Sequence, residues 1–436
     1  MKNKKILIYG LGTTGMSAID ALKDENKLYI YDDDKARANM LEEEFPFYDG
    51  QDVDFVVKSP GIPLDSGLLP EFEEREIPVI SDIELAYRIS ECENFIAITG
   101  TNGKTTTTDL LYHLLIDGGK VAYVGGNIGV GVLPLAKRAK KDDYLVIECS
   151  SFQLETTLDF KPKVAILTNI TEDHLDHHKS VEAYRKSKEK VFANQDSTDV
   201  LILNIDDPYL AMIGEEMDRA LVVSTTPIQQ DGAYKDQDLL YLSHEGEHIP
   251  LMKRSEMLLV GDHNVRNALE AALCAYVLGV DVASIKNTLM NYRGVSHRME
   301  YVDTFNGVDY YNDSKGTNPD STDVALASLT KPIHLLAGGF DKGSDFKALF
   351  EKHALSIAGL YVFGATKEVI KEEAMEAGIK NVLEFETMKE ATEAAMDRAV
   401  EGEAVLLSPA CASWDQFPNY RVRGDEFKAI VRERWS

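Results

Sequence analysis

A glycine-rich segment that ends in Lys-Thr carries the clearest chemical signal in the chain. Residues 98–106 read Ile-Thr-Gly-Thr-Asn-Gly-Lys-Thr-Thr, between a predicted strand at Phe95–Ile98 and a predicted helix at Thr107–Leu115. Such a loop directs backbone N–H groups, a helix N-terminus and one ammonium group toward a polyphosphate. The Thr105 hydroxyl is then placed to bind a phosphate-associated Mg²⁺. Because Ile98 occupies the first glycine position of the strict P-loop pattern, Gly100 takes that role in a shorter loop.

Two acidic or histidine-rich segments follow other predicted strands. Glu148 comes after the strand Tyr144–Ile147, where ligands gather in open α/β sheets, so it could hold Mg²⁺ directly or through water, or cap a helix. Residues 171–178, Thr-Glu-Asp-His-Leu-Asp-His-His, follow the strand Val164–Thr168. They allow a zinc site of a hydrolase, a histidine that supports a second Mg²⁺, or a plain polar loop. The nearby phosphate loop favours the Mg²⁺ interpretation.

The N-terminal region carries a dinucleotide-type fingerprint. Gly10-x-Gly12-x-x-Gly15 lies between a predicted strand, Lys5–Tyr9, and a predicted helix, Met16–Leu22. Asp32 ends the next predicted strand, Lys27–Tyr31. Alone, this pattern predicts NAD binding, but the same geometry serves any ligand with a pyrophosphate, including a UDP-sugar.

Two further segments carry residues suited to nucleotide or carboxylate binding. Asp313-Ser314-Lys315 closes a predicted strand, where a lysine beside an acid and a helix-start threonine can bind phosphate or a carboxylate, and Arg298 precedes it. Asn264 and Asn267 lie three residues apart on a predicted helix, and they could read an adenine edge or cap the helix.

The elements that must position these residues alternate between strand and helix, which predicts parallel, doubly wound sheets. We predict an α/β protein with three domains: a Rossmann-like N-terminal domain at 1–88, a central domain at 89–294 with a P-loop ATPase-type parallel sheet, and a Rossmann-like C-terminal domain at 295–436. A turn-rich stretch at 226–250 could form a β-meander. The remaining predicted strands are Asp54–Lys58, Val200–Asn204, Tyr310–Asn312, Ile333–Ala337, Leu360–Phe363 and Ala404–Leu407, and the remaining predicted helices are His263–Leu278 and Asp425–Arg434.

Composition excludes several classes of protein. The net charge of −27 repels nucleic acid and anionic membranes, so any anionic ligand needs a local cluster of donors. The four cysteines lie far apart, which argues against a disulfide framework or a cysteine zinc site. No apolar run approaches the ~20 residues of a membrane span. We therefore expect a soluble cytoplasmic protein, and a monomer because no heptad pattern is sustained.

Taken together and in this order, the segments resemble the Mur ligase family, whose members are ATP-dependent amide ligases of peptidoglycan synthesis. The resemblance spans essentially the whole chain. The sequence motifs that the chain shares with the family are Gly100–Thr105, Gly126-Asn127-Ile128-Gly129, Asp173-His174, His263-Asn264-x-x-Asn267, His297-Arg298-x-Glu300 and Asp313-Ser314-Lys315. Two segments, 148–155 (Glu-Cys-Ser-Ser-Phe-Gln-Leu-Glu) and 407–417 (Leu-Ser-Pro-Ala-Cys-Ala-Ser-Trp-Asp-Gln-Phe), narrow it to the branch that adds D-glutamate.

This resemblance implies an enzyme that joins D-glutamate to UDP-N-acetylmuramoyl-L-alanine through an acyl phosphate and a tetrahedral intermediate. Its implied cofactors are two Mg²⁺ ions, and ATP is the implied co-substrate. The resemblance also implies a carbamate on Lys188, and Lys186 and Lys190 are the neighbouring lysines that could carry it instead. Nucleic acid and membrane are not implied partners. The implied catalytic residues are Lys104, Asn127, His174, Lys188 and Lys315, and the implied metal ligands are Thr105, Glu148, His174 and Lys188.

The resemblance also implies three binding sets. For ATP they are Gly100, Thr101, Asn102, Gly103, Lys104, Thr105, Thr106, Asn264, Asn267, Arg298 and Asp313. For the UDP substrate they are Gly12, Thr13, Thr14, Asp32, Ser59, Gly61, Asn127 and Ser150. For D-glutamate they are Thr317, Lys342, Ser413 and Tyr420, with Lys315 beside them.

Three alternatives stay open at this point. Another Mur ligase or a folylpolyglutamate synthetase would use most of the same segments, but not 148–155 and 407–417. An NAD-dependent oxidoreductase would explain only Gly10–Gly15. A non-catalytic nucleotide-binding regulator would bind ATP without releasing ADP in response to an amino acid.

Overall fold

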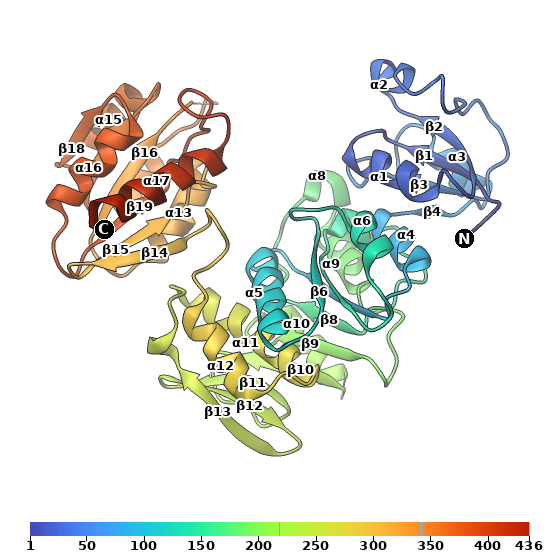
Figure 1. Cartoon of the computed structure of the whole chain (residues 1–436), viewed down its shortest axis with the longest axis horizontal. Helices are drawn as coiled ribbons and strands as arrows, with labels where there is room; N and C mark the ends of the chain where they lie inside the picture. Colours follow the sequence, from blue (N-terminus) through green and yellow to red (C-terminus); the bar gives the residue numbers. More distant parts are fainter. Residues whose placement is uncertain (218, 341–342, 436) are drawn as a thin grey trace. The chain divides into compact units, whose positions relative to one another are not determined.

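A computed structural model describes residues 1–217, 219–340 and 343–435 (Figure 1). The chain forms two compact units. The first contains Met1–Arg254 and Val265–Leu289, and the second contains Ser255–Asn264 and Met290–Ser436. Among the described residues, no helix is both long and apolar enough to cross a bilayer.

The first unit opens with a small parallel sheet whose strand order is β2-β1-β3-β4. The Gly10 carbonyl oxygen would lie 1.9 Å from a Cβ at residue 15, so the glycine there lets helix α1 pack closely on β1. Its strands are β1 Lys5–Tyr9, β2 Lys27–Tyr31, β3 Phe55–Lys58 and β4 Val79–Ile80. Its helices are α1 Thr13–Leu22, α2 Lys35–Asn39, α3 Leu69–Glu74 and α4 Asp82–Ile89.

A nine-stranded sheet forms the rest of the first unit, in the order β13-β12-β11-β10-β9-β8-β5-β7-β6. β5, which leads into the phosphate loop, pairs in parallel with both β7 and β8. β11 to β13 are joined as antiparallel hairpins, which accounts for the turn-rich stretch at 226–250. The strands are β5 Asn94–Thr99, β6 Ala122–Gly126, β7 Tyr144–Glu148, β8 Val164–Leu167, β9 Val200–Asn204, β10 Ala220–Ser224, β11 Gly232–Asp236, β12 Leu239–His244 and β13 Glu247–Lys253.

Side-chain caps fix several helices that follow these strands. Ser150 and Gln153 form a reciprocal capping box at α7, and the Ser180 hydroxyl caps α9. The helices are α5 Lys104–Asp117, α6 Val132–Arg138, α7 Ser151–Leu154, α8 Leu175–His178, α9 Val181–Glu189, α10 Pro208–Glu216, the 3₁₀ turn Arg254–Glu256, α11 Asp262–Val277 and α12 Val282–Asn291.

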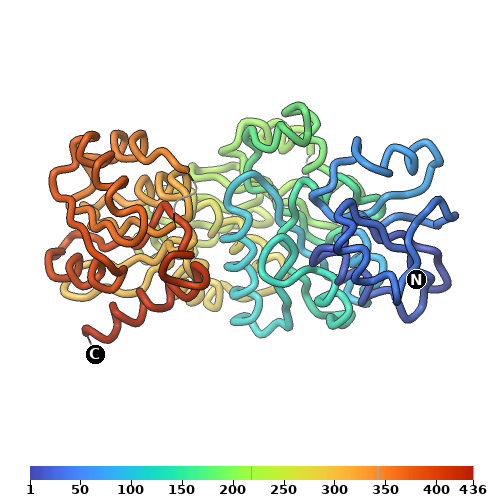
Figure 2. Tube along the Cα trace, turned by 90° about the horizontal axis from the view of Figure 1, so that it is seen from above, coloured from blue at the N-terminus to red at the C-terminus, as the bar shows by residue number. Residues whose placement is uncertain are grey.

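The second unit is built on a six-stranded sheet in the order β14-β15-β19-β16-β17-β18. Successive residues of its strands enter different cores: Leu335 joins the cluster with α13, α14 and α15, whereas Leu336 joins the cluster with α16 and α17. Helices therefore cover both faces of this six-stranded sheet. In Figure 2, α17 is the dark red helical segment near the C-terminus. The elements are β14 Glu300–Phe305, β15 Val308–Asn312, α13 Pro319–Ala327, β16 Ile333–Gly338, α14 Lys347–His353, β17 Ile357–Phe363, α15 Lys367–Glu376, β18 Val382–Phe385, α16 Met388–Arg398, β19 Ala404–Leu407 and α17 Tyr420–Trp435.

The predicted fold class, three α/β domains with the phosphate loop in the middle one, is confirmed. The predicted strands occur within a few residues of their expected bounds. Some helices begin earlier than predicted. α5 starts at Lys104 because Gly103, with φ of 87°, turns the chain directly into the helix. The exact domain boundaries stay predictions.

Candidate active site

The phosphate loop joins β5 to α5 and depends on two glycines with positive φ. A Cβ at Gly100, where φ is 151°, would lie 1.9 Å from Thr168 Oγ1, and one at Gly103 would lie 2.4 Å from Asn267 Oδ1. Neither position can accept a side chain without displacing its neighbour. Lys104 Nζ donates to the carbonyl oxygens of Gly100 at 2.8 Å and Thr101 at 2.7 Å. The ammonium group is therefore held over the loop that would receive a polyphosphate.

Glu148 links this loop to the neighbouring strand. It lies at the end of β7 and is 2% exposed. Its Oε2 accepts a hydrogen bond from Thr105 Oγ1 at 2.8 Å, and its Oε1 accepts one from Asn127 Nδ2 at 2.8 Å. One carboxylate thus brings the phosphate loop and the loop after β6 together.

Lys188 enters the same region from α9. It is 1% exposed, and its Nζ donates to the Gly100 carbonyl oxygen at 2.8 Å while lying 4.7 Å from the centre of the Tyr184 ring. Burial, with a smaller contribution from the Lys104 charge, lowers the pKa of Lys188 to about 7. A large share of this amine is therefore unprotonated at neutral pH.

A cavity of about 240 Å³ collects these side chains from separate parts of the first unit. The His174 side chain is 46% exposed, and its ring centre lies 4.9 Å from that of Phe152. His174 has φ of 51° at the start of α8, a conformation that costs energy for a residue with a Cβ and is common at functional sites. The cavity is lined by Lys104, Asn127, Ser150, Ser151, Phe152, His174, Tyr184 and Lys188.

The donor set at Thr105 and Glu148 fits Mg²⁺, which prefers hydroxyl, carboxylate and water oxygens. The two side chains bond each other at 2.8 Å, so their oxygens already point at one place. His174 and Lys188 fit a second cation only in part, because an ammonium group is not a ligand. A carbamate on Lys188 would supply the missing anionic oxygen.

In the small N-terminal sheet, the predicted UDP-binding residues surround the ends of β1, β2 and β3. Gly12 precedes α1, which begins at Thr13 and Thr14. Asp32 Oδ2 accepts from the Leu11 backbone N–H at 2.6 Å, and Ser59 Oγ donates to the Gly10 carbonyl oxygen at 3.0 Å. Asp32 and Ser59 therefore hold the glycine turn in place, and Gly61 lies in the exposed turn that follows.

In the second unit, predicted nucleotide and amino-acid ligands lie on the loops after β15 and β19. Asp313 is 4% exposed, and its carboxylate accepts from Ser408 Oγ at 2.7 Å and from the Met299 backbone N–H at 3.1 Å. Burial raises its pKa to about 6. Arg298 and Lys315 are exposed near this carboxylate, and both charges oppose the rise.

The predicted D-glutamate ligands fall partly in this same region. Ser413 is buried after β19, and Thr317 is half-buried before α13. The Tyr420 carbonyl oxygen accepts from Ser314 Oγ at 2.8 Å, which places the start of α17 beside the Asp313-Ser314-Lys315 loop. Lys342 lies outside the described residues. Of the two asparagines on α11, Asn267 lies at the phosphate loop, whereas Asn264 Nδ2 donates to the Val260 carbonyl oxygen.

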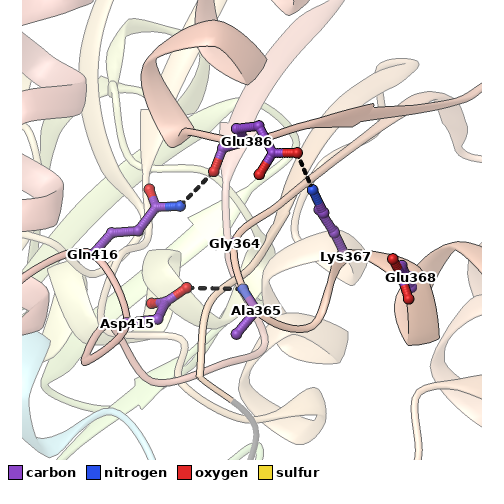
Figure 3. A pocket seen from close by; sticks show the side chains of 7 residues that line it. All are labelled: Gly364, Ala365, Lys367, Glu368, Glu386, Asp415 and Gln416. Carbon is purple, nitrogen blue, oxygen red and sulfur yellow. Dashed lines mark hydrogen bonds and ion pairs between the residues drawn. The ribbon is translucent and has the colours of Figure 1, made fainter.

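A cavity of about 410 Å³ lies beside the segment 407–417, at the start of α15 (Figure 3). Asp415 accepts from the Ala365 backbone N–H at 3.0 Å, and Gln416 Nε2 donates to the Glu386 carbonyl oxygen at 2.6 Å. Lys367 forms an ion pair with Glu386. Asp415 and Gln416 are therefore used to position the loop that carries Ser413.

Arg423 is among the largest fully buried side chains of the described residues, and it was not predicted from the sequence. Its Nη2 donates to the carbonyl oxygens of Ser314 at 2.9 Å and Cys411 at 3.1 Å, and its Nε donates to Ser314 Oγ at 3.0 Å. It ties the loops after β15 and β19 together. No local pattern marks it, because an arginine in a polar helix usually faces solvent. Asn169 was also missed, although it lies two residues after the end of β8; its Oδ1 accepts from the Asn102 backbone N–H at 2.9 Å.

Removing the buried charge at Asp313 should stabilise the second unit. Because its pKa rises from the ordinary 3.8 to about 6, the folded state binds more protons between these values, and the free energy of unfolding falls as pH rises through them. We expect Asp313→Asn to gain about 1–3 kcal/mol relative to the parent between about pH 4 and pH 7. Urea unfolding across this range measures it, and a parallel pH profile for the two proteins would contradict it.

Comparison with known proteins gives two family matches. The model described as "Mur ligase middle domain" matches residues 98–275, and that described as "Mur ligase, glutamate ligase domain" matches residues 297–411. The UDP-N-acetylmuramoylalanine–D-glutamate ligases of Thermoanaerobacter sp. (strain X514) and Clostridioides difficile (strain 630) are 40% and 38% identical to the chain, over 99% of each sequence.

Two solved structures share the fold over nearly the whole chain. The UDP-N-acetylmuramate-alanine ligase of Thermotoga maritima has a TM-score of 0.58 at 20% identity, covering 99% of this chain and 100% of that one. A UDP-N-acetylmuramoyl-L-alanyl-D-glutamate–2,6-diaminopimelate ligase has a TM-score of 0.61 at 18% identity, covering 100% and 93%.

The phosphate loop, the carboxylate that faces it and the buried lysine, on the middle of three α/β domains, define a nucleotide-dependent enzyme. With full-length relatives at this level of identity, the chain belongs to the Mur ligase family. A third solved structure with this fold, the MurF ligase of Thermotoga maritima, is in complex with ADP.

Proposed function

We propose that the chain joins D-glutamate to UDP-N-acetylmuramoyl-L-alanine, with cleavage of ATP to ADP and phosphate, in cytoplasmic peptidoglycan precursor synthesis. The observation that carries this proposal is the full-length similarity to relatives that bear that name. The segments 148–155 and 407–417 support it, because one supplies the buried Glu148 and the other the buried Ser413.

The chemistry requires activation of a carboxylate. A carboxylate oxygen of the muramoyl substrate attacks the γ-phosphorus of ATP, ADP leaves, and an acyl phosphate forms. The unprotonated amine of D-glutamate then attacks the acyl carbon to give a tetrahedral oxyanion. The attacking nitrogen loses one proton to solvent, and the intermediate collapses as phosphate leaves with one of the original carboxylate oxygens. The Lys104 ammonium, held over the phosphate loop, counters the repulsion between the two anionic substrates.

Four residues of the first unit would hold two Mg²⁺ ions. Thr105 and Glu148 would hold one, and His174 and a carbamylated Lys188 would hold the other. Bound Mg²⁺ would withdraw charge from the phosphate oxygens. The position of Lys188 supports a carbamate, because the buried amine has a pKa of about 7 and lines the cavity, where CO₂ can react with its neutral form.

The remaining residues would bind the substrates. The nucleotide would be contacted by Asn264, Asn267, Arg298 and Asp313. Lys315, Thr317, Lys342, Ser413 and Tyr420 would surround D-glutamate. Asn127 and Ser150, which line the cavity of the first unit, would orient the muramoyl end of the substrate. We expect the enzyme to act as a monomer.

ADP release tests this function. The purified protein is incubated with ATP, Mg²⁺ and UDP-N-acetylmuramoyl-L-alanine, and with D-glutamate, L-glutamate or no amino acid. We expect release that requires both the muramoyl nucleotide and D-glutamate. Release with L-glutamate in a parallel incubation, in which a folate replaces the muramoyl nucleotide, would support the folylpolyglutamate alternative. ATP binding without any release would support a regulator.

A further inference from the structure

A second cluster of metal-ligating side chains lies next to the catalytic cavity and has no part in the proposed reaction. Among the described residues, Glu155, His177 and His178 form the one group of three or more such side chains whose ligand atoms all lie within 4.8 Å of one another. Glu155 follows α7, whereas the two histidines end α8.

The spacing within this cluster matches a four-coordinate transition metal. His177 Nε2 lies 3.1 Å from Glu155 Oε2, and His178 Nδ1 lies 3.9 Å from Glu155 Oε1. Ligands about 2.0–2.1 Å from a tetrahedral ion lie about 3.3 Å from one another. Small side-chain rotations therefore suffice to surround an ion.

The surroundings also suit a metal site. His178 is 6% exposed, and its Nε2 lies 2.9 Å from Ser151 Oγ, so this contact orients the ring and leaves Nδ1 facing Glu155. His177 and Glu155 have side chains that are 10% and 20% exposed, which leaves a path from solvent and room for a water ligand. Lys190 Nζ donates to the backbone carbonyl of Glu155 at 2.6 Å.

We propose that Glu155, His177 and His178 form a binding site for a first-row transition metal, with Zn²⁺ as the best match, distinct from the catalytic Mg²⁺ sites. Two imidazoles and one carboxylate favour Zn²⁺ over Mg²⁺, which prefers oxygen ligands alone. One carboxylate and two neutral imidazoles leave a net positive site that a water or hydroxide would complete.

Phe152 connects this site to the catalytic cavity, which it lines. Its ring is stacked on that of His178 at 5.5 Å between centres, and lies 4.9 Å from the ring of His174. A metal at the cluster joins the end of α7 to the end of α8. It would thereby restrain the segment that presents His174, so Zn²⁺ should raise the melting temperature of the full-length protein.

Cobalt spectroscopy provides the test, because four-coordinate Co²⁺ absorbs strongly in the visible range and replaces Zn²⁺. The EDTA-treated full-length protein is titrated with Co²⁺ in excess Mg²⁺, which occupies the oxygen-rich sites. We expect one Co²⁺ per chain with four-coordinate bands, displaced by Zn²⁺. Glu155→Gln and His177→Ala should each weaken binding by about tenfold or more.

His174→Asn is the matched control, because it removes a histidine of the same segment, and asparagine tolerates the positive φ at that position. We expect this variant to keep the Co²⁺ bands and the Zn²⁺-dependent rise in melting temperature. Bands lost in His174→Asn but kept in His177→Ala would place the ion at the catalytic residues and overturn the proposal. Weak bands typical of six-coordinate Co²⁺, or the absence of bound Co²⁺, would also overturn the proposal. Glu155→Gln nearly preserves side-chain shape, so it carries the test if His177→Ala misfolds. This inference does not depend on the proposed ligase activity.

Discussion

Lys188→Met should lower kcat by about 10²–10³-fold or more, while the protein stays folded. The substitution removes an amine that is 1% exposed and replaces it with an apolar side chain of similar length, so the buried position remains filled. The loss follows from the proposed role, because a positioned charge in a dry site commonly contributes this much to the rate. Steady-state ADP release measures it.

Lys186→Met is the matched control. Lys186 lies two residues away on the same helix, but its side chain is 71% exposed and pairs with Glu182. We expect no more than about a twofold change, since isolated surface ion pairs contribute little. Equal losses in the two variants would show that α9, and not the Lys188 amine, is what the reaction requires.

Lys188 should also make the enzyme depend on CO₂ and on pH. The Lys188 amine reacts with CO₂ only in its neutral form. Because its pKa is about 7, the neutral form dominates above pH 7 and is lost as the pH falls below 7. We expect activity to fall after CO₂ is removed and to return with bicarbonate. In ¹³C-bicarbonate a carbamate resonance should appear, be absent from Lys188→Met and weaken below about pH 7. A resonance that persists in Lys188→Met would assign the carbamate to another amine.

Arg423→Met should destabilise the second unit by about 2–5 kcal/mol and raise KM for D-glutamate more than it lowers kcat. Loss of the guanidinium leaves the carbonyl oxygens of Ser314 and Cys411 without their donor in a buried site. The two loops that carry Lys315 and Ser413 then lose the hydrogen bonds through which Arg423 joins them. Urea unfolding and steady-state kinetics measure the two effects.

Arg432→Met provides the comparison, because Arg432 lies on the same helix but is exposed. It should change stability by less than about 0.5 kcal/mol. Arg423→Lys should not restore the parent, since an ammonium group cannot reproduce the fork of three hydrogen bonds. Full activity and stability in Arg423→Met would show that the loops hold their positions without it.

The sequence predicts the fold well because the local signals agree with the tertiary structure. Apolar runs such as Lys5–Tyr9 and Ala404–Leu407 are predicted as strands and form strands in the structure. A strand that is covered by helices on both faces of its sheet needs apolar residues at nearly every position, and this makes it recognisable in the sequence. The phosphate loop was predictable for a different reason. Gly100 and Gly103 adopt φ of 151° and 87°, where a residue with a Cβ is strained.

The remaining features depend on three-dimensional packing that spacing does not encode. Composition alone does not separate Lys186, Lys188 and Lys190. The family resemblance points to Lys188, and the burial of Lys188 against Tyr184 and Gly100 is seen only in the structure. Asp32 matches a ribose-binding position, yet its carboxylate also bonds the Leu11 N–H of its own glycine turn. The fully buried Arg423 gave no sequence signal. The predicted ligand roles of individual residues stay predictions.

The most direct test of the proposed reaction uses UDP-N-acetylmuramoyl-L-alanine with ¹⁸O in its terminal carboxylate. After turnover with ATP, Mg²⁺ and D-glutamate, mass spectrometry follows the label. An acyl phosphate predicts that the released phosphate carries one ¹⁸O atom and that the nucleotide product has gained glutamate. With L-glutamate we expect neither labelled phosphate nor an amide product. Phosphate without ¹⁸O, or labelled phosphate with no amide product, would contradict an acyl-phosphate mechanism.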